Sequence, residues 1–349
     1  MSSSIKHRFI NDYSELAHPE IIKAMSAIGT RQFEGYGLDE FSFKAAELVK
    51  DKFSVPDADV HFIGGGTHAN LVVLSSILRP HEAVIAPVSG HISVHEAGAI
   101  EATGHKICAV GGKDGKLRAA DIDATVLWHE DEHCVKPRVA YVSQSTENGT
   151  VYTKTELAAI SECCRKNGLY LYLDGARLGA AVNSPASDLS YAELAKLVDI
   201  FYLGGTKNGA LFGEAIVICA DGLKTDFRYY LKQKGAMLAK GAAIGLQFEA
   251  LLKSGLYDEL AVHANRMALK MAEGIKRSGY DFLYPAETNQ IFPVFPADVS
   301  GDLHKYYDFY DWLEVGDKIA ARIVASWATP ESIVDEFLSD LEASAQARH

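Results

Sequence analysis

Two short apolar runs, each leading into a polar residue beside glycine, constrain the fold more than any other feature. Leu169–Leu173 ends at Asp174, and Ile200–Leu203 leads into the glycine-flanked lysine of Thr206–Gly209. Apolar runs of this length with such endings predict buried strands of an α/β sheet. Ligands of open α/β sheets bind beyond the carboxyl ends of the strands. We therefore expect Asp174 and Lys207 to face the same crevice.

An amine and a carboxylate at one crevice suit the chemistry of pyridoxal phosphate. This cofactor needs a lysine to form a Schiff base and a carboxylate to keep its pyridine nitrogen protonated. We predict that Lys207 and Asp174 fill these two catalytic and cofactor-binding roles. The alternative is that Asp174 starts a turn and that Lys207 is a solvated loop lysine.

A glycine turn earlier in the chain predicts an anion site. The apolar run Val60–Ile63 leads through Gly64–Asn70 into the apolar segment Leu71–Leu78. A strand, a glycine turn and a helix N-terminus together present free backbone N–H groups to an anion. The motif matches neither the dinucleotide nor the ATP fingerprint. We assign Gly65, Gly66 and Thr67 to the cofactor phosphate, and the alternative is a plain tight turn.

The order of these motifs resembles a known family. Gly-Gly-Gly-Thr-His at 64–68, Leu-Asp-Gly-Ala-Arg at 173–177 and Gly-Gly-Thr-Lys-Asn-Gly at 204–209 are similar to motifs of the aspartate-aminotransferase-fold enzymes, and within them of the threonine aldolase and β-eliminating lyase family. The similarity spans about Asn11 to Arg322. It implies an α/β, fold type I architecture: a large domain (1–244) with a mostly parallel sheet and a smaller C-terminal α+β domain (245–349).

The resemblance also assigns roles to single residues. His91 matches an aromatic position that stacks on the pyridine ring, and imidazole can also transfer protons near neutral pH. Arg177 matches an arginine near the ring and the substrate carboxylate, and Arg322 matches the arginine that holds the α-carboxylate. The alternatives are a structural histidine, an arginine paired with a surface acid, and an edge-strand arginine. Glu96 could orient His91, and His95 is expected to pack.

Further candidates have weaker support. Asn11 stands where the family commonly has a serine near the substrate carboxylate, and Tyr36 lies in a glycine-rich loop resembling one at the subunit boundary. Thr206 and Gln144 are predicted to bind the cofactor, and Lys240 to reach the neighbouring subunit's phosphate. The family's loop histidine, proposed to deprotonate the substrate hydroxyl, is missing, because 144–148 offers only amides, hydroxyls and one acid.

Bulk properties narrow the class of protein. A chain of 349 residues predicts two domains, and a net charge of −12 argues against nucleic acid or an anionic membrane as the main partner. We find no membrane-length apolar run, no apolar signal core in the first twelve residues and no metal-ligand spacing. The five cysteines are odd in number and lack a CxxC pair, which favours reduced thiols in the cytoplasm.

Local patterns also predict particular helix boundaries. The segment that opens at Ser89 is expected to form one helix running to Ala102. Another helix is expected over Thr155–Lys166, with Thr155 as its N-cap.

The resemblance implies aldol cleavage of L-threonine or L-allo-threonine to glycine and acetaldehyde. It also implies a homodimer or homotetramer with shared active sites. Other reactions of the same cofactor, namely β-elimination, transamination or racemisation, remain open because the fold does not determine the reaction. A non-catalytic protein of the same fold is the remaining alternative.

Overall fold

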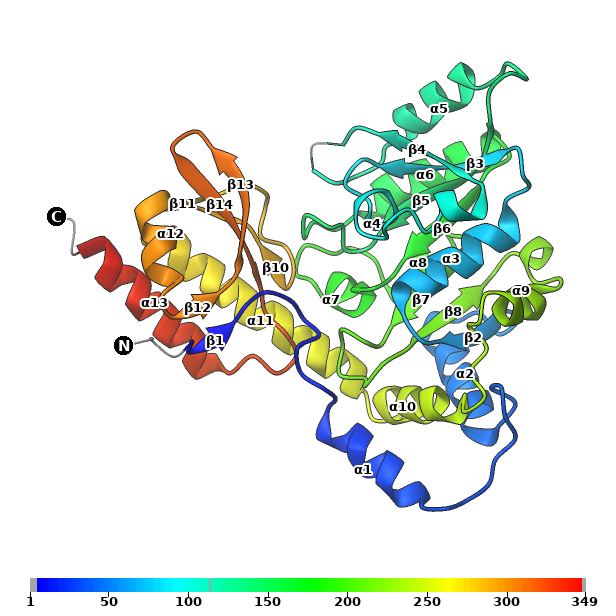
Figure 1. Ribbon diagram of the computed structural model, residues 1–349, viewed down its shortest axis with the longest axis horizontal. Coiled ribbons are helices and arrows are strands. Elements are labelled where there is room, and N and C mark those ends of the chain that lie inside the picture. Colours follow the sequence, from blue (N-terminus) through cyan, green and yellow to red (C-terminus); the bar gives the residue numbers. More distant parts are fainter. Residues whose placement is uncertain (1–4, 113, 347–349) are drawn as a thin grey trace.

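The larger lobe of the molecule is built on one sheet with both faces covered (Figure 1). The computed structural model describes residues 5–112 and 114–346. Within them, the sheet has the order β2-β8-β7-β6-β5-β3-β4. Its strands are β2 (Asp59–Ile63), β3 (Glu82–Pro87), β4 (Lys106–Val110), β5 (Lys136–Ser143), β6 (Tyr170–Asp174), β7 (Ile200–Gly204) and β8 (Glu214–Ile218). Only β8 runs antiparallel to its neighbours, which confirms the mostly parallel sheet.

Alternating side chains explain why the strands read as continuous apolar runs. In β3, Val84 and Ala86 enter the core on one face of the sheet, whereas Ala83 and Ile85 enter the core on the other. Successive strand residues point to opposite faces, so a sheet covered on both sides needs apolar residues at every position. The carboxyl ends of the parallel strands are then the natural place for polar residues.

Helices cover the two faces of this sheet. Side chains of α3 and α9 pack on one face, and those of α2, α6 and α10 pack on the other. The helices of this lobe are α1 (Pro19–Ile28), α2 (Glu40–Phe53), α3 (Gly66–Ile77), α4 (His91–Val94), α5 (Ala119–Trp128), α6 (Lys154–Lys166), α7 (Leu178–Val182), α8 (Tyr191–Ala195), α9 (Phe227–Gln233) and α10 (Ala242–Lys253). Short 3-10 turns lie at Glu101–Thr103 and Asp221–Leu223.

Two expectations about helix boundaries are wrong. The segment after Ser89 forms only the short α4, because Ala97 (φ 51°) and Gly98 (φ 73°) adopt the left-handed conformation and break the helix. The N-cap of α6 is Thr153 and not Thr155. Its side-chain hydroxyl accepts a hydrogen bond from the backbone N–H of Glu156, and the Glu156 carboxylate accepts one from the backbone N–H of Thr153. This reciprocal capping box fixes the helix start.

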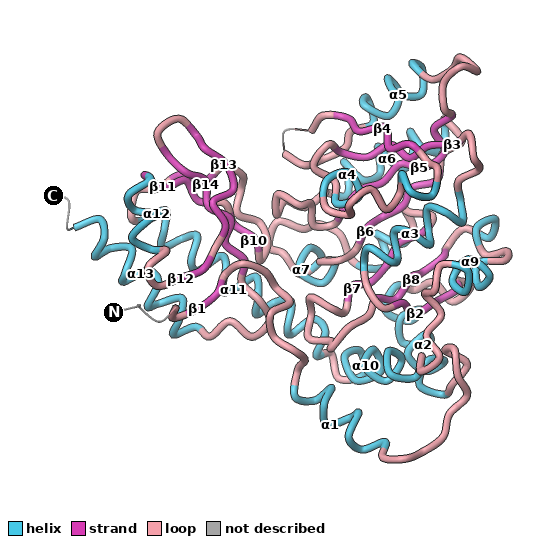
Figure 2. The backbone as a smooth tube through the Cα atoms, viewed as in Figure 1, coloured by secondary structure: helices cyan, strands magenta, loops and turns pink. Residues whose placement is uncertain are grey.

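The smaller lobe is an antiparallel sheet packed on helices (Figure 2). The strand order is β10-β14-β11-β9, with β13 also paired to β14. The elements are β9 (Asp281–Phe282), β10 (Gln290–Ile291), β11 (Pro293–Pro296), β13 (Tyr310–Val315), β14 (Lys318–Val324), α11 (Leu256–Arg277), α12 (Ala297–Leu303) and α13 (Glu331–Gln346). The N-terminal β1 (His7–Arg8) pairs with β12 (Tyr307–Asp308), which ties the start of the chain to this lobe.

Core packing bears on where the two domains meet. Phe248 and Leu260 belong to the core of the larger lobe, whereas Met267 and later residues of α11 belong to that of the smaller lobe. Phe9 also packs into the smaller lobe. We therefore propose that the division falls inside α11, somewhat beyond the expected boundary at 244/245, and that the N-terminal strand is part of the small domain.

Candidate active site

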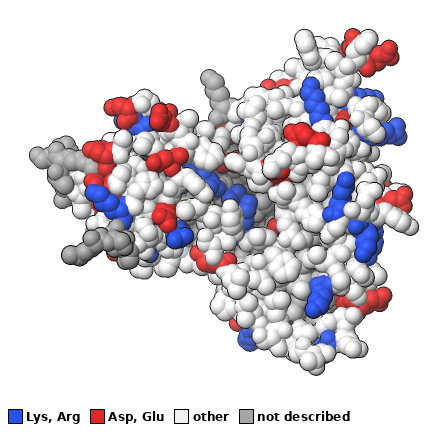
Figure 3. All heavy atoms as spheres, in the orientation of Figure 1, with Lys and Arg blue, Asp and Glu red and all other residues white. Residues whose placement is uncertain are grey.

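A cavity of about 480 Å³ brings together the two lobes. Lys and Arg side chains are visible in the hollow between the lobes (Figure 3). The residues that line the cavity are Tyr13, His91, His95, Glu147, Arg177, Lys207, Gln290, Tyr310, Asp311, Trp312 and Arg322. Four residues from the sequence prediction therefore share one space: His91, Arg177, Lys207 and Arg322.

Lys207 is positioned by a tight turn after β7. Gly205 has no room for a side chain, because a Cβ there would lie 2.7 Å from the Gly213 carbonyl oxygen and 2.9 Å from the Phe248 ring. Burial, and then the Arg177 guanidinium, lower the pKa of Lys207, with partial opposition from nearby carboxylates. A lowered pKa leaves more of the amine neutral, which is the state that attacks a carbonyl carbon.

Asp174 is a buried carboxylate with four hydrogen-bond donors. Oδ1 accepts from the Tyr202 hydroxyl and the Ala176 backbone N–H, and Oδ2 accepts from the Tyr141 hydroxyl at 2.7 Å and from Asn70 at 3.1 Å. Burial raises the pKa of Asp174, but the Tyr202 hydrogen bond, nearby His91 and Tyr141 outweigh it, so the pKa falls below its ordinary value. The group is held ionised, as a partner for a protonated ring nitrogen must be.

Two chains of polar contacts run from Asp174 to His91. The first passes through Asn70, which donates to both Asp174 and Glu96, and Glu96 Oε1 lies 2.8 Å from His91 Nδ1. The second passes from Tyr141 to Ser143, 3.3 Å apart, and then to Glu147, which accepts the His91 backbone N–H. The expected orienting role of Glu96 matches the first chain. Together they fix the position and orientation of the His91 ring relative to Asp174.

The glycine turn lies beside Asp174 but outside the cavity lining. A Cβ on Gly66 would lie 2.9 Å from the hydroxyl of Tyr202, the same hydroxyl that bonds Asp174. Gly66 opens the twelve-residue α3. A Cβ added to Gly64 or Gly65 would meet no atom within 4 Å, so the space beside both is open. The first N–H groups of a helix lack intrahelical partners, so this turn fits a phosphate. Thr67 is exposed in the first turn, and the Thr206 hydroxyl accepts from the Gly213 N–H.

The two arginines of the cavity have different partners. Arg177 forms a bidentate ion pair with the buried Asp12, with N–O distances of 2.7 and 2.9 Å. Arg322 donates only to neutral oxygens, those of Gln290 at 2.6 Å and Ile10 at 3.2 Å, and has no carboxylate in ion-pair range among the described residues. Burial, then repulsion from Arg177, lower the pKa of Arg322 to about 10. Arg322 is the guanidinium left to bind an added carboxylate.

Nine predicted residues are not among those that line the cavity. Five of them, described above, are Asp174, Gly65, Gly66, Thr67 and Thr206, and the other four are Asn11, Gln144, Tyr36 and Lys240. Asn11 uses its side-chain oxygen to accept from Tyr13 and Ser14. The side-chain amide of Gln144 exchanges hydrogen bonds with the Tyr152 backbone, at 2.9 and 3.2 Å, and so holds the loop after β5. Its assignment to the cofactor stays a prediction.

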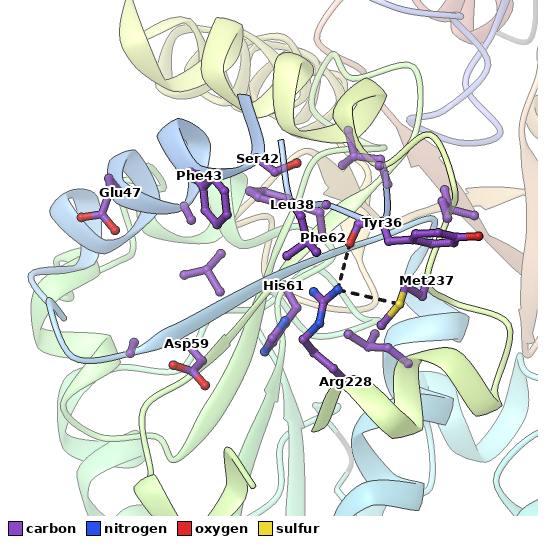
Figure 4. A pocket seen from close by; sticks show the side chains of 18 of the residues that line it. Tyr36, Leu38, Ser42, Phe43, Glu47, Asp59, His61, Phe62, Arg228 and Met237 are labelled. Carbon is purple, nitrogen blue, oxygen red and sulfur yellow. Dashed lines mark hydrogen bonds between the residues drawn. The ribbon is translucent and has the colours of Figure 1, made fainter. Parts of the chain in front are cut away.

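Tyr36 and Lys240 lie elsewhere on the surface. Figure 4 shows Tyr36 at a separate pocket, where Arg228 donates to its backbone oxygen at 3.2 Å. Lys240 is exposed at another hollow beside α10. Within one chain neither residue reaches the cavity of Lys207. Their assigned roles at a subunit boundary stay predictions.

The structure adds cavity residues that the sequence prediction missed. Tyr13 faces Lys207, whose Nζ lies 5.8 Å from the centre of the Tyr13 ring. Tyr310 and Trp312 come from the β13–β14 hairpin, where Tyr310 pairs with Arg322 and Trp312 is the extra residue at a break in register. Glu147 follows β5 just as Asp174 and Lys207 follow their strands. That shared position was the available signal for Glu147, whereas the hairpin residues carry no local one.

The chain is similar to known proteins along most of its length. The family model described as beta-eliminating lyase matches residues 13–297. The low specificity L-threonine aldolase of Pseudomonas sp. (strain NCIMB 10558) is 33% identical over 95% of this chain and 96% of its own, and that of Pseudomonas aeruginosa is 33% identical over 95% of both.

Solved structures extend the similarity. The threonine aldolase of Leishmania major is 45% identical, with a TM-score of 0.96 over 97% of this chain and 99% of its own. Serine palmitoyltransferase of Sphingomonas wittichii, at 13% identity and a TM-score of 0.72 over 98% of this chain and 87% of its own, shares the fold alone. On sequence and structure together, the chain belongs to the beta-eliminating lyase family, as its motifs predicted.

Proposed function

We propose that the protein is a pyridoxal-phosphate-dependent lyase that cleaves L-threonine or L-allo-threonine to glycine and acetaldehyde. The observation that carries the proposal is that a lysine of lowered pKa faces the same cavity as an arginine that pairs with no carboxylate in the described part of the chain. Support comes from the relatives, which are named threonine aldolases. The amine suits a carbonyl-bearing cofactor, and the guanidinium, which donates to the neutral oxygens of Gln290 and Ile10, suits the carboxylate of an amino-acid substrate.

The donor set fits the cofactor. Lys207 would hold its aldehyde carbon, Asp174 its ring nitrogen, and the turn of Gly65, Gly66 and Thr67 its phosphate, with His91 placed to contact the ring. When bound, pyridoxal phosphate supplies an electron-withdrawing ring that stabilises the electron pair left on the α-carbon of an amino acid. The ionised state of Asp174 favours protonation of the ring nitrogen, which strengthens this withdrawal.

Residues of this chain would hold the substrate around that centre. Arg322 binds the α-carboxylate through two parallel N–H···O bonds, a geometry that fixes the direction of the remaining substituents. Arg177 adds positive potential while its own hydrogen bonds remain with Asp12. Tyr310 and Trp312 line the same cavity and would bound the space for the β-substituent.

Product analysis tests the reaction. The purified protein, supplied with pyridoxal phosphate, is incubated separately with L-threonine, L-allo-threonine, L-serine and L-cysteine, and acetaldehyde, glycine and pyruvate are measured. We expect acetaldehyde and glycine in equal amounts from the first two substrates. Pyruvate without acetaldehyde would contradict aldol cleavage and favour β-elimination on the same site.

We also propose that the active form is at least a dimer in the cytoplasm. The pocket around Tyr36 and the exposed Lys240 lie away from this chain's own cavity, as expected for residues that serve a neighbouring subunit. The five cysteines are all free thiols. No helix in the described ranges is long and apolar enough to span a bilayer. Sedimentation showing an active monomer would contradict the assembly.

A further inference from the structure

One acidic side chain of the cavity is not used by the cofactor or carboxylate sites. Glu147 lies four residues beyond the end of β5 and lines the same cavity as Lys207, Arg177 and Arg322. The loop that carries it offers no histidine, and the Gln144 side chain is turned to the Tyr152 backbone. Glu147 is therefore the titratable group that this loop presents to the cavity.

The bonding of Glu147 is one-sided. Oε1 accepts the His91 backbone N–H at 2.9 Å and the Ser143 hydroxyl at 2.7 Å. Oε2 is enclosed and has no hydrogen-bond partner among the described residues. A buried carboxylate oxygen without a donor costs free energy, and a proton bound there removes that cost. Burial accordingly raises the pKa of Glu147. The carboxyl is thus held rigidly and is prepared to accept a proton.

Three other acid–base groups of the cavity already have a partner or a role, and a fourth, His95, binds a proton less readily than usual. His91 Nδ1 is bound to Glu96, and Lys207 is the amine that holds the cofactor in the proposed function. Asp311 accepts from Ser300 at 3.0 Å and lies 3.1 Å from His304, both in the smaller lobe. Burial lowers the pKa of His95, as do His91, Arg322 and Lys207. Glu147 combines a raised affinity for a proton with a side chain that lines the cavity of Lys207.

We propose that Glu147 is the catalytic residue that takes the β-hydroxyl proton of the substrate. This inference rests on the proposed function. The O–H bond breaks as the proton moves to the carboxylate, the oxygen's electron pair forms the aldehyde C=O bond, and the Cα–Cβ pair stays on Cα. The Lys207 side chain, protonated at this stage, gives its proton to Cα as glycine forms. Proton transfer through water from the Glu147 carboxyl to the Lys207 amine then restores both groups.

E147Q isolates this role. Glutamine keeps an oxygen that can accept from the His91 N–H and Ser143, but it is not a proton acceptor at ordinary pH. We expect E147Q to lose at least about 100-fold in kcat for L-threonine, the scale of general base catalysis. Its spectral titration with L-threonine should give a Kd within about threefold of the wild type, since carboxylate binding is untouched.

Exchange of the glycine α-proton with D₂O, followed by NMR, separates a catalytic from a structural role. If Glu147 were only structural, its substitution would slow this exchange as well as cleavage. Glycine has no β-hydroxyl, so E147Q should exchange it within about threefold of the wild-type rate. Equal losses of exchange and cleavage, or cleavage within about tenfold of the wild type, would overturn the proposal. E249Q is the matched control, because Glu249 also has an enclosed, unpartnered Oε2 but lies on α10 outside the cavity.

Two further arms keep the outcome clear. If circular dichroism shows that E147Q does not fold, E147D carries the test. Its withdrawn carboxyl should slow cleavage by at least about tenfold while glycine exchange persists, and parallel loss of both would overturn the role. Failure of the proposed function looks different, because the wild-type protein would then release no acetaldehyde from threonine.

Discussion

The two walls of the cavity are built in opposite ways. The larger lobe contributes residues that follow parallel strands, such as Glu147 after β5, Arg177 after β6 and Lys207 after β7. The smaller lobe contributes the antiparallel β13–β14 hairpin, with Arg322 opposite Tyr310. The first wall carries the carboxyl, guanidinium and amine groups around Lys207, and the second carries Arg322 beside Tyr310, Asp311 and Trp312. Under the proposed function, bond-breaking chemistry and recognition of the substrate carboxylate lie on separate domains, and substitutions on each wall can test this.

Removing the amine of the first wall should have the largest effect. Lys207→Ala should lower threonine cleavage by at least about 10⁴-fold, as removal of a covalent nucleophile does. The visible absorption band of the lysine-bound cofactor should disappear from the spectrum. Lys253→Ala, at the exposed end of α10, is the control and should keep both properties. A Lys207→Ala protein that stays yellow without added amine would contradict the assignment.

The buried ion pair between the walls should matter for stability. Arg177→Met leaves Asp12, which is 1% exposed, charged and without its guanidinium. Loss of one partner of a buried pair costs about 3–5 kcal/mol of unfolding free energy. Urea unfolding would measure it, and the double variant Asp12→Asn, Arg177→Met should recover part of the loss. A single-variant cost below about 1 kcal/mol would show that the pair does not hold the N-terminal segment against the site.

Glu214, behind Lys207 on the first wall, should make stability depend on pH. Its Oε2 accepts from the Gly205 N–H at 2.8 Å, and burial raises its pKa from 4.5 to about 7. A carboxyl whose folded-state pKa is raised favours the folded state at low pH, and this contribution is lost as pH rises from about 4.5 to 7. Glu214→Gln should therefore gain on the wild type across that window, by up to about 3 kcal/mol.

Unfolding curves at pH 4.5, 6 and 8 would measure this difference. Glu193→Gln is a suitable comparison, since the hydrogen bond to Lys154, followed by those to Ser190, lowers the pKa of Glu193 to about 2. The difference in unfolding free energy between Glu193→Gln and the wild type should stay nearly constant across the same pH window. A difference between Glu214→Gln and the wild type that stays flat, or that shrinks as pH rises, would mean that Glu214 is ionised in the fold throughout.

The contrast between the walls also explains what the sequence could predict. Residues of the first wall can be recognised from the local sequence. An apolar run, a glycine and a polar residue stand within a few positions of each other, as at Asp174 and Lys207. Glu147 has the same setting but lacks a recognisable motif. The Asp12–Arg177 pair joins segments 165 residues apart, and no local spacing encodes that contact.

The second wall is encoded over longer range. Arg322 is a polar residue inside the apolar run Ile319–Val324, which marks it as unusual, and in the structure it is half-buried at the cavity. Trp312 reaches the cavity through a register break in β13, a feature that depends on pairing with β14 and not on the strand's own composition. The prediction of a helix up to Ala102 was wrong for a similar reason. Alanine is a good helix former, so its own propensity does not indicate the left-handed conformation that Ala97 adopts.

Arg322 gives the sharpest comparison between the walls, because its loss should change binding and leave the chemistry in place. Arg322→Met should raise KM for L-threonine by about 100-fold, the value of charge-assisted hydrogen bonds to one carboxylate, with a smaller fall in kcat. Arg322→Lys keeps the charge without the planar guanidinium, so its KM should fall between those of the wild type and Arg322→Met. The cofactor spectrum should match the wild type, unlike that of Lys207→Ala. If KM stays within about threefold while kcat collapses, Arg322 acts on the reacting bond, and recognition and chemistry are not divided between the domains.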